Sequence, residues 1–563
     1  MALTLASATR LLKRNGLLRE LIRADRWTLD PYSFDGFDGF YGADTNFTDI
    51  TYDTRKVSRG GLLFCKGRFR PEFLDDIDDT GLAAYVAETP YADKTGSVGI
   101  IVNDVRKAMS LLASEYYCRP QDSLTVVGIT GTKGKTTTAY FVQSILNSFS
   151  GNKSALFSSV DDCLDGVHYH ESNLTTPESL DLFRMMRTAL DNGMRYLVME
   201  VSSQAYKVDR VYGLHFDVGA FLNISPDHIS PIEHPTFEDY LFCKRQITQH
   251  SSHLVLGRDC AYADLILEDA KASSTTVSRF ALGKSCVRDG SVSSESSESS
   301  ESSDAIRRAT DGDDSNSSAT DSVATVCAVP VSNSGTERYS MFISHESLTK
   351  IGDFTLSIEG AFNAANAAAA IAIALQLGIP QDSDALHALE SVKIQGRMER
   401  FSARNIVAYV DYAHNYASVT ALLDFVDHKY GSKHPRITLI TGSAGDKAYD
   451  RRKEIVDAAQ NRIARFIFTE EDTETEPHEA ICEQMLGYVT NPSVEASIIM
   501  GRTEAIAQAI EESRADRTTL NVILVIGKGE ERWIKDYGRH KQYEGDDHAV
   551  ERLLAQYNQH AED

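Results

Sequence analysis

Apolar runs of strand length recur along the chain and alternate with stretches of helical spacing. Apolar runs rich in β-branched residues predict buried strands. The predicted strands are Gly81–Glu88, Gly99–Asp104, Leu124–Thr130, Tyr196–Val201, Phe216–Ile224, Asn405–His414, Arg436–Asp446, Ala464–Asp472 and Leu520–Glu531. Leu11–Ile22 and the alanine-rich Gly360–Ile379 predict helices. Because helical patterns separate many of the strands, we expect an α/β protein with mostly parallel sheets.

The most informative stretch is Ser123–Ser148, in which a predicted strand, a glycine-rich turn and a helix follow one another. Glycines in the turn, Gly131-Thr-Lys-Gly-Lys135, allow backbone N–H groups to close around phosphates, and the helix N-terminus adds partial positive charge. Lys135 would reach the terminal phosphates, and Thr136 would ligate Mg²⁺. The usual motif has glycine where this chain has Ile129. The flanking strand and helix nevertheless favour a nucleotide site over an ordinary turn.

The length of the chain, 563 residues, suits about three domains. We expect a small N-terminal α/β domain at residues 1–120, a central P-loop ATPase-like domain with a parallel sheet at 121–395, and a C-terminal Rossmann-like α/β domain at 396–563. Residues 287–322 are serine-rich and acidic and cannot bury enough apolar surface to fold alone, so we expect a disordered insertion there.

Charge and cysteine content narrow the partners and the compartment. The net charge of −24 argues against a general binder of nucleic acid or of an anionic membrane, but it does not forbid a local basic site for a phosphorylated substrate. Eight scattered cysteines without a CxxC pair predict free thiols in a reducing compartment. Residues 1–14 lack the charge order of a signal peptide, and no apolar run is long enough to span a bilayer. We therefore expect a cytoplasmic protein.

Two polar residues at strand ends, Glu200 and His228, are candidate metal ligands. In open α/β sheets, ligands bind beyond the carboxyl ends of the strands. Taken singly, each residue has a simpler interpretation, as a strand-end residue that meets solvent or as a turn histidine. Because both occur in the domain of the phosphate loop, and because hard ligands suit Mg²⁺, together they predict a Mg²⁺ site. Asn363 and Asn366 would either cap the alanine-rich helix or contact the nucleotide.

A series of short motifs in this chain resembles the Mur ligases of peptidoglycan synthesis. The motifs are TGTKGKTT (130–137), LTTP (174–177), MEVSSQAYKVDR (199–210), NISPDH (223–228), Tyr240-x-x-x-Lys244, GAFNAANAAAA (from 360), GRMER (396–400), DYAH (411–414), GSAGDK (442–447) and GKGEE (527–531). The resemblance covers nearly the whole chain outside the serine-rich insertion, and it is closest to the branch that adds L-lysine or a similar diamine. It implies an N-terminal domain for the UDP end of UDP-N-acetylmuramoyl-L-alanyl-D-glutamate, a central ATP-binding domain and a C-terminal domain that brings the amino acid.

The resemblance also implies roles for individual residues. For ATP it implies Gly131, Thr132, Lys133, Gly134, Lys135, Thr136, Thr137, Asn363, Arg397 and Asp411, and for the nucleotide sugar it implies Thr54, Thr175, Thr176, Ser202 and Arg210. For Mg²⁺ it implies Thr136, Glu200, His228 and Lys244, and the catalytic set would be Lys135, Glu200, His228 and Lys244. Lys244 would be carbamylated to N6-carboxylysine, because an ammonium group has no lone pair for a metal whereas a carbamate offers an anionic oxygen. Without the resemblance, Lys244 would be interpreted as a surface lysine, and Thr54 as part of a charged turn.

The region 469–477 bears on the amino acid that is added. The resemblance implies contacts from Glu471, Asp472, Glu474, Gly527 and Glu531. Relatives that add diaminopimelate have Asp-Asn-Pro-Arg in this region, whereas this chain reads TEEDTETEP and has no arginine there. Acidic residues would repel a carboxylate and attract an ammonium group, which favours L-lysine or L-ornithine over meso-diaminopimelate. The simpler alternative is that these acids continue an acidic helix start.

Two further departures from the family pattern are Asn415-Tyr416 after DYAH and Glu530 in GKGEE, and neither is expected to touch the ATP chemistry.

The implied reaction has two steps. The D-glutamate side-chain carboxylate attacks the γ-phosphoryl group of ATP to give an acyl phosphate and ADP, and the amine of the diamino acid then displaces phosphate. Mg²⁺ and Lys135 would stabilise the developing charge, and the domains would close on binding. The alternatives are a ligase similar to folylpolyglutamate synthetase, against which the region around Thr54 argues, and a non-catalytic nucleotide-dependent switch protein, against which Glu200, His228 and Lys244 together argue. We expect a monomer.

Overall fold

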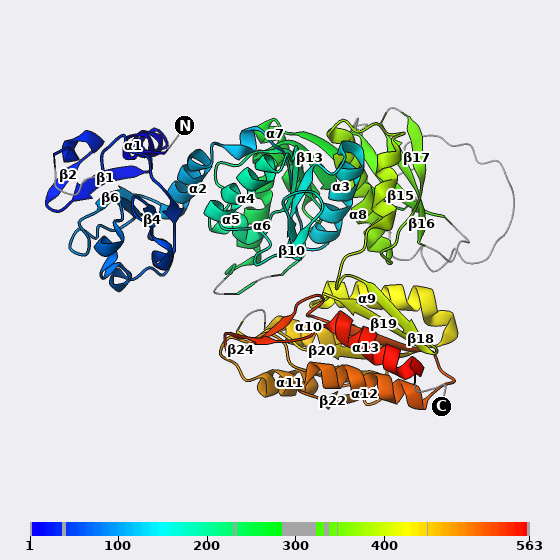
Figure 1. The fold of residues 1–563 in the computed structure, drawn as a ribbon. Helices are drawn as coiled ribbons and strands as arrows, with labels where there is room; N and C mark the ends of the chain where they lie inside the picture. Colours follow the sequence, from blue (N-terminus) through cyan, green and yellow to red (C-terminus); the bar gives the residue numbers. More distant parts are fainter. Residues whose placement is uncertain are drawn as a thin grey trace.

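The computed structural model describes residues 3–36, 41–227, 229–230, 233–283, 323–331, 337–345, 347–446 and 449–559. Three α/β units follow one another along the chain, each built around its own sheet (Figure 1). The predicted fold class is therefore confirmed, while the exact domain boundaries stay predictions. The stretch 287–322, for which we predict disorder, lies outside the described residues.

The N-terminal unit is built on a six-stranded sheet of order β2-β1-β6-β5-β4-β3. Its elements are α1 (Leu5–Arg14), β1 (Leu18–Arg23), β2 (Arg26–Thr28), β3 (Ile50–Thr51), β4 (Leu62–Phe64), β5 (Ala84–Ala87), β6 (Val98–Val102) and α2 (Val105–Tyr116). The helix predicted at Leu11–Ile22 is wrong after Arg14, where α1 ends. The chain turns at Gly16 with a φ of +68°, and the residues that follow join the sheet as β1. Leu21 and Ile22 then bury in clusters on opposite faces, as a strand requires.

The central unit is built on an eleven-stranded sheet of order β10-β9-β8-β11-β7-β12-β13-β14-β15-β16-β17. Its strands are β7 (Thr125–Thr130), β8 (Ser154–Phe157), β9 (Asp161–Cys163), β10 (Tyr169–Glu171), β11 (Tyr196–Glu200), β12 (Phe216–Phe221), β13 (Ser251–Gly257), β14 (Thr276–Leu282), β15 (Thr325–Pro330), β16 (Arg338–Ser344) and β17 (Leu348–Thr355). Its helices are α3 (Lys135–Ser150), α4 (Ser179–Asp191), α5 (Ser203–Lys207), α6 (Phe237–Gln249), α7 (Ala263–Ser273) and α8 (Ala361–Gln376). The strands from β8 to β15 in this order are parallel, so their carboxyl ends meet at one edge of the sheet.

Helices cover both faces of the central sheet. Helices α3 and α8 pack on one face and α4, α5 and α6 lie on the other (Figure 1). Val127 and Ile129 of β7 bury in the cluster that contains α3 and α8, whereas Val126 buries in the opposite cluster. A strand that is buried on both faces needs a continuous apolar run, which is why the sequence pattern predicts β7 so clearly. The glycine-rich turn after β7 is thereby held between two layers of helices.

The C-terminal unit is built on a six-stranded sheet of order β18-β19-β23-β20-β21-β22 with helices on both faces (Figure 1). Its strands are β18 (Glu399–Ala403), β19 (Ile406–Asp411), β20 (Arg436–Thr441), β21 (Arg465–Phe468), β22 (Glu495–Ile498) and β23 (Asn521–Ile526), followed by the hairpin β24 (Trp533–Asp536) and β25 (Arg539–Gln542). Its helices are α9 (Tyr416–Tyr430), α10 (Asp450–Ala459), α11 (His478–Gly487), α12 (Arg502–Ala515) and α13 (Asp546–Gln559). The four strands predicted here are confirmed as β19, β20, β21 and β23.

Two global expectations can be compared with this fold. Cys65, Cys118, Cys163, Cys243, Cys260 and Cys482 have free thiols, whereas the free-thiol prediction is wrong for Cys327, which is disulfide-bonded. Spacing along the chain carries no information about such a pairing, which depends on distances in space. Within the described ranges, no helix combines the length and the apolar character that crossing a membrane requires.

Asp104 caps helix α2, which packs against α4 and so joins the N-terminal unit to the central one. Its Oδ1 accepts hydrogen bonds from the backbone N–H groups of Arg106 and Lys107, both at 3.0 Å. We expect Asp104→Ala to lower stability by about 1 kcal/mol, because two helix N–H groups lose their acceptor. The unfolding transition of the N-terminal unit, followed by calorimetry, should fall by about 4 °C. Asp104→Asn keeps the acceptor oxygen and should stay close to wild type; an unchanged transition in the alanine variant would contradict the capping role.

Candidate active site

A cavity of about 610 Å³ lies where the central and C-terminal units meet. The predicted site residues that line it are Thr132, Lys133, Gly134, Lys135, Thr136, Thr137, Thr175, Glu200, Asn363, Arg397, Asp411, Glu471, Asp472, Gly527 and Glu531. They come from the turn after β7 and from the carboxyl ends of strands in both sheets. The fold therefore brings together around one cavity most of the residues predicted to contact ATP, the nucleotide sugar, Mg²⁺ and the amino acid.

The phosphate loop requires glycine at position 134 and holds the side chain of Lys135 close to its backbone. Gly134 has a φ of +86°, and a Cβ atom there would lie 2.3 Å from Oδ1 of Asn366, so only glycine fits. Lys135 Nζ donates to the carbonyl groups of Gly131 and Thr132 at 3.2 and 3.4 Å. These contacts hold the ammonium group over the loop, at the place where phosphates would bind.

Asn363 and Asn366 do not cap helix α8. The cap residue is Gly360, and no side-chain hydrogen bond is made there. Asn366 Nδ2 donates to Oδ1 of Asn363 at 3.0 Å, and both side chains line the cavity. The capping interpretation is therefore wrong, and the nucleotide contact stays a prediction.

Glu200 and Lys244 are both buried beside the phosphate loop, with exposed fractions of 1% and 2%. Glu200 Oε1 accepts from the backbone N–H of Ser159 at 2.9 Å. Lys244 Nζ donates to the Gly131 carbonyl at 2.9 Å, and among the described residues it has no carboxylate in ion-pair contact. Burial, together with the nearby charge of Lys135, holds the pKa of Lys244 well below its usual range. Lys244 is thus a buried amine rather than the surface lysine that its sequence alone suggested.

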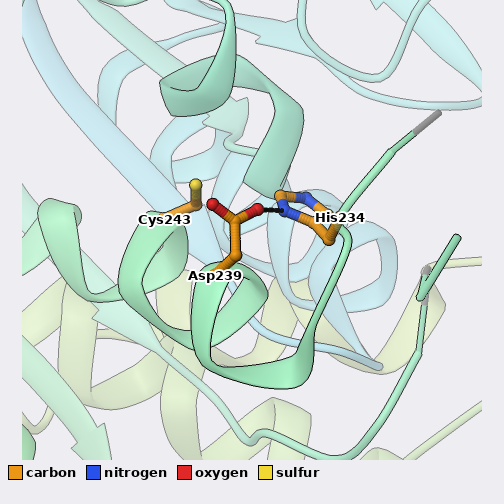
Figure 2. A group of neighbouring side chains, drawn as sticks. All are labelled: His234, Asp239 and Cys243. Atoms are coloured by element: carbon orange, nitrogen blue, oxygen red, sulfur yellow. Dashed lines mark hydrogen bonds and ion pairs between the residues drawn. The ribbon is translucent and has the colours of Figure 1, made fainter. Parts of the chain in front are cut away.

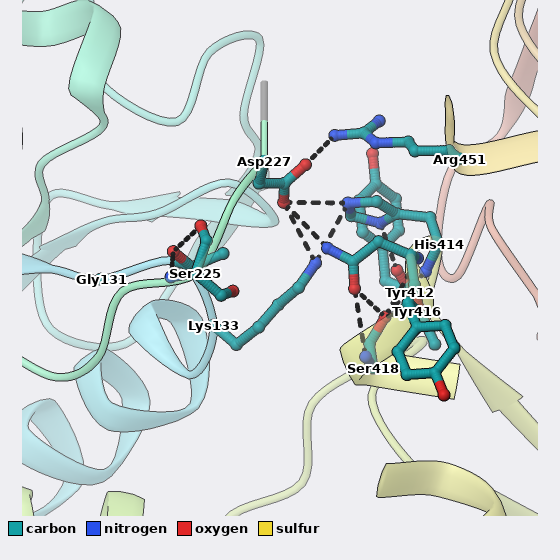
Figure 3. Close-up of polar contacts among 12 residues, drawn as sticks. Gly131, Lys133, Ser225, Asp227, Tyr412, His414, Tyr416, Ser418 and Arg451 are labelled. Carbon is teal, nitrogen blue, oxygen red and sulfur yellow. Dashed lines mark hydrogen bonds and ion pairs between the residues drawn. The ribbon is translucent and has the colours of Figure 1, made fainter. Parts of the chain in front are cut away.

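The other predicted metal ligand, His228, lies outside the described residues, but its neighbour Asp227 is the centre of a polar cluster between the two units (Figure 3). Arg451 donates to Oδ1 of Asp227, and Asn415 Nδ2 donates to Oδ2 at 3.1 Å. Lys133 Nζ lies 3.5 Å from the same oxygen. Asp227, Arg451 and Asn415 are not among the site residues predicted from the sequence, since no local pattern indicates a contact between residues so far apart in the chain.

His414 links the phosphate loop to the C-terminal unit in the same cluster (Figure 3). Its Nε2 lies 3.1 Å from Nζ of Lys133, and its Nδ1 lies 2.7 Å from the carbonyl oxygen of Tyr412. Burial and the charges of Lys133 and Arg451 lower the pKa of His414 to about 3. The ring is therefore neutral, with Nδ1–H donating to the carbonyl and Nε2 accepting from the lysine.

Arg397 approaches the cavity from the C-terminal unit. Its Nη1 donates to Oε2 of Glu530 at 3.0 Å, and its guanidinium lies 4.4 Å from the ring centroid of Tyr412. Burial raises the pKa of Glu530 to about 7 despite this arginine. Asp411, whose pKa burial also raises, accepts from the backbone N–H groups of Met398 and Ala413 at 2.9 and 2.8 Å. Glu530, which departs from the family motif at 527–531, thus forms an ion pair with Arg397, and Arg397 lines the cavity.

Three of the residues predicted for the nucleotide sugar lie together at the end of β11. Thr176 Oγ1 donates to the Glu200 carbonyl at 2.9 Å and accepts from the Ser202 backbone N–H at 3.0 Å. Arg210 Nη1 donates to the Thr176 carbonyl at 3.1 Å. Thr175 lines the cavity next to them.

Thr54 lies apart from these residues, on a 3-10 turn of the N-terminal unit (Thr54–Lys56) that Asp53 caps. Asp53 also forms an ion pair with Arg55 at 2.8 Å, so the interpretation of this segment as a charged turn is confirmed. Its role toward a substrate stays a prediction.

The acidic region predicted for the amino acid is only partly free. Lys528 pairs with Asp472 at 2.7 Å and also with Glu531, while Glu474 pairs with Lys535 and does not line the cavity. Neither pairing with the acids at 471–474 can be inferred from a local sequence pattern, because Lys528 lies 56 residues from Asp472 and Lys535 lies 61 residues from Glu474.

Glu471 differs from these paired acids. Among the described residues it has no partner in a hydrogen bond or ion pair, and burial together with Asp472 and Glu531 raises its pKa to about 7. Gly527 makes room for it: its φ is +104°, and a Cβ atom there would lie 2.6 Å from Oε2 of Glu471. Glu471 is therefore an acidic group of the cavity that is available to a ligand.

Comparisons with known proteins identify the family. The signature of the Mur ligase middle domain matches residues 129–374, and that of the Mur ligase glutamate ligase domain matches residues 396–529. A UDP-N-acetylmuramyl-tripeptide synthetase of Bifidobacterium longum is 57% identical over 98% of this chain and 100% of its own length. The chain belongs to the Mur ligase family.

Other Mur ligases extend the comparison. A UDP-N-acetylmuramoyl-L-alanyl-D-glutamate--L-lysine ligase of Enterococcus faecalis is 36% identical over 99% of this chain and 100% of its own. Among solved structures, a UDP-N-acetylmuramoyl-L-alanyl-D-glutamate--2,6-diaminopimelate ligase has the same fold with a TM-score of 0.58, at 19% identity, and the match covers 99% of this chain and 100% of that one. As a Mur ligase, the protein is an ATP-dependent ligase of peptidoglycan-precursor synthesis, so that prediction is confirmed and the non-catalytic switch has no support.

Proposed function

We propose that this Mur ligase adds a diamino acid, with L-lysine favoured and L-ornithine the second choice, to the D-glutamate of UDP-N-acetylmuramoyl-L-alanyl-D-glutamate in the cytoplasm. ATP supplies the energy, and an acyl phosphate on the D-glutamate side chain is the intermediate. The observation that carries the choice of amino acid is Glu471, which has no partner among the described residues and lines the cavity that also contains the phosphate loop. The names of the relatives from Bifidobacterium longum and Enterococcus faecalis support the same reaction.

The balance of charge around Glu471 favours an ammonium group over a carboxylate. Lys528 is shared by Asp472 and Glu531, and Lys535 pairs with Glu474. The four acids of this region thus face two ammonium groups, which leaves an excess of negative charge when Glu471 is ionised. The side-chain ammonium of L-lysine or L-ornithine would be attracted there, whereas the distal carboxylate of meso-diaminopimelate would meet like charge.

The other residues of the cavity would bind and orient the remaining substrates. The residues proposed for ATP are Gly131, Thr132, Lys133, Gly134, Lys135, Thr136, Thr137, Asn363, Arg397 and Asp411. Lys135 would hold the terminal phosphates and offset the charge that develops on their oxygens. Thr54, Thr175, Thr176, Ser202 and Arg210 would bind the nucleotide sugar, and the position of the last four at the end of β11 would aim its D-glutamate at the phosphate loop.

The residues near the phosphate loop fit a Mg²⁺ ion if Lys244 is carbamylated. The Thr136 hydroxyl and the Glu200 carboxylate offer hard oxygen ligands, as Mg²⁺ prefers. Lys244 does not fit as an amine, but its buried position without a carboxylate partner among the described residues suits a carbamate, which would complete the set with His228. When bound, Mg²⁺ would offset the negative charge of the phosphates.

Phosphate release by the purified protein tests the proposal. The protein would receive ATP, Mg²⁺, UDP-N-acetylmuramoyl-L-alanyl-D-glutamate and, in separate reactions, L-lysine, L-ornithine or meso-diaminopimelate. We expect release with L-lysine, weaker release with L-ornithine and none above background with meso-diaminopimelate. Release only with meso-diaminopimelate would overturn the assignment of the amino acid. If folded protein that binds ATP released no phosphate with any of the three amino acids, the proposed reaction would be overturned, and a sister ligase similar to folylpolyglutamate synthetase would be favoured.

A further inference from the structure

His234 is a fully buried histidine outside the cavity, with an exposed fraction of 0%. It precedes helix α6 and lies beside Asp239 and Cys243 (Figure 2). These three side chains bring a nitrogen, a carboxylate oxygen and a sulfur atom within 4.8 Å of one another. Such a group can either hold a metal ion or fix the imidazole by hydrogen bonds, and the contacts distinguish the two.

Both ring nitrogens of His234 are hydrogen-bonded to protein. Nδ1 lies 2.7 Å from Oδ2 of Asp239, and Nε2 lies 2.9 Å from Oγ of Ser203. Because an ionised carboxylate only accepts, Nδ1 carries the proton, and in the neutral ring Nε2 accepts from the serine hydroxyl. The other oxygen of Asp239 accepts from Lys207 Nζ at 2.6 Å. With these atoms already paired, the arrangement is an anchor for the imidazole rather than a metal site.

The order Ser203–His234–Asp239 also matches that of a hydrolytic triad, but Ser203 is 5% exposed and does not line the cavity. A nucleophile must be reachable by its substrate, so a hydrolytic role does not follow. The hydrogen bonds from Ser203 through His234 to Asp239 instead connect helix α5 to helix α6. Ser203 opens helix α5 three residues after Glu200, and Asp239 lies in the first turn of α6, the helix that carries Lys244.

A second contact extends the anchor to the phosphate loop. The ring of His234 packs edge-on against Tyr240, with 5.3 Å between the ring centroids. The hydroxyl group of Tyr240 lies 3.1 Å from Oγ1 of Thr132 in the loop. The backbone carbonyl of His234 also accepts from the N–H of Ser230 at 2.9 Å.

We propose that His234 is a positioning residue of the ligase reaction. It holds the segment from Glu200 to Ser203 against helix α6, so that Glu200 and Lys244, which come from different elements, face the same place beside the phosphate loop. The inference rests on the proposed function, which gives those two residues the Mg²⁺ ion. Hydrogen-bond partners of metal ligands typically contribute 10- to 100-fold to metal affinity or activity, and we expect an effect of this size from His234, which acts through Ser203 and helix α6.

Three variants test the anchor: His234→Gln, Ser203→Ala and the double variant. For His234→Gln we expect kcat to fall about 10- to 100-fold and the Mg²⁺ concentration at half-maximal rate to rise about tenfold. The KM for the diamino acid should stay unchanged, because that amino acid would bind on the C-terminal unit. Both single variants break the hydrogen bond between His234 Nε2 and Ser203 Oγ. The double variant should therefore be no slower than His234→Gln.

His253→Gln is the matched control. His253 lies in the same unit, and its two ring nitrogens lie 2.7 and 2.9 Å from the hydroxyl oxygens of Thr276 and Ser278. It holds two strands together away from the cavity, so its loss should leave kcat and the Mg²⁺ requirement at wild-type values.

Hydrogen–deuterium exchange without Mg²⁺ or substrates gives a readout that does not depend on catalysis. Amide protons of residues 200–207 should exchange faster in His234→Gln than in wild type or in His253→Gln. Wild-type kinetics or wild-type exchange in His234→Gln would overturn the proposal, and so would stoichiometric binding of zinc by the wild type that the variant loses. If the wild type itself released no phosphate, the proposed function would fail, while the exchange experiment would still decide whether His234 is an anchor.

Discussion

Lys244→Ala is expected to lower kcat by about 1,000-fold, a larger loss of activity than for any other substitution proposed in this protein. The side chain is 2% exposed and donates to the carbonyl of Gly131, with no carboxylate partner among the described residues. A permanent ammonium group without a counter-ion is costly in such a place. An amine that reacts with carbon dioxide would instead supply an anionic oxygen next to Glu200 and the phosphate loop. Removing it leaves the proposed Mg²⁺ site short of one ligand.

Single-turnover phosphate release at saturating substrates measures the effect. Acetate or formate, added to Lys244→Ala, should restore part of the rate by occupying the space of the carbamate, and wild-type protein kept free of carbon dioxide should lose activity that bicarbonate returns. Lys153→Ala, at an exposed lysine of the same unit, is the control and should behave as wild type. A Lys244→Ala rate within tenfold of wild type, or one that no carboxylate improves, would remove Lys244 from the catalytic set.

Local patterns were sufficient to predict the parts of the site that a single segment forms. The strand, glycine turn and helix around Lys135 follow one another without interruption, and β7 is buried on both faces, so its apolar run and the turn could be interpreted directly. The same reasoning failed at Leu11–Ile22, where an amphipathic pattern suits a helix and a strand equally, and where the turn at Gly16 decides between them.

Contacts between distant segments could not be predicted in this way. Asn415 looked like a neutral departure from a family pattern, yet it donates to Asp227, which is 188 residues away. The lysines that neutralise two of the acids at 471–474 come from distant segments: Lys528 follows β23, which β20 separates from β21 in the sheet, and Lys535 lies in the hairpin strand β24. Sequence alone thus predicts the correct sign of the charge in this region but not which acid is available.

Availability to a ligand distinguishes Glu471 from its neighbours, and Glu471→Gln is therefore expected to raise the KM for L-lysine by about 100-fold, with kcat and the KM for ATP nearly unchanged. Loss of one partner of a buried pair of charges typically costs about 2–5 kcal/mol, and a 100-fold change corresponds to about 2.7 kcal/mol. Glu470→Gln is the matched control, because Glu470 is already paired with Lys541 at 3.2 Å and does not line the cavity.

The pH dependence of the KM for L-lysine gives an independent test of the same residue. Burial raises the pKa of Glu471 to about 7, so the carboxyl group is mostly neutral at pH 6 and mostly ionised at pH 8. Because only the ionised form attracts the ammonium group, the KM for L-lysine should fall about tenfold between these pH values in the wild type. Glu471→Gln has no group to ionise there and should lose this dependence, whereas Glu470→Gln should keep it. If the KM for L-lysine follows pH equally in wild type and Glu471→Gln, another group binds the side-chain ammonium, and the preference for L-lysine must come from elsewhere in the cavity.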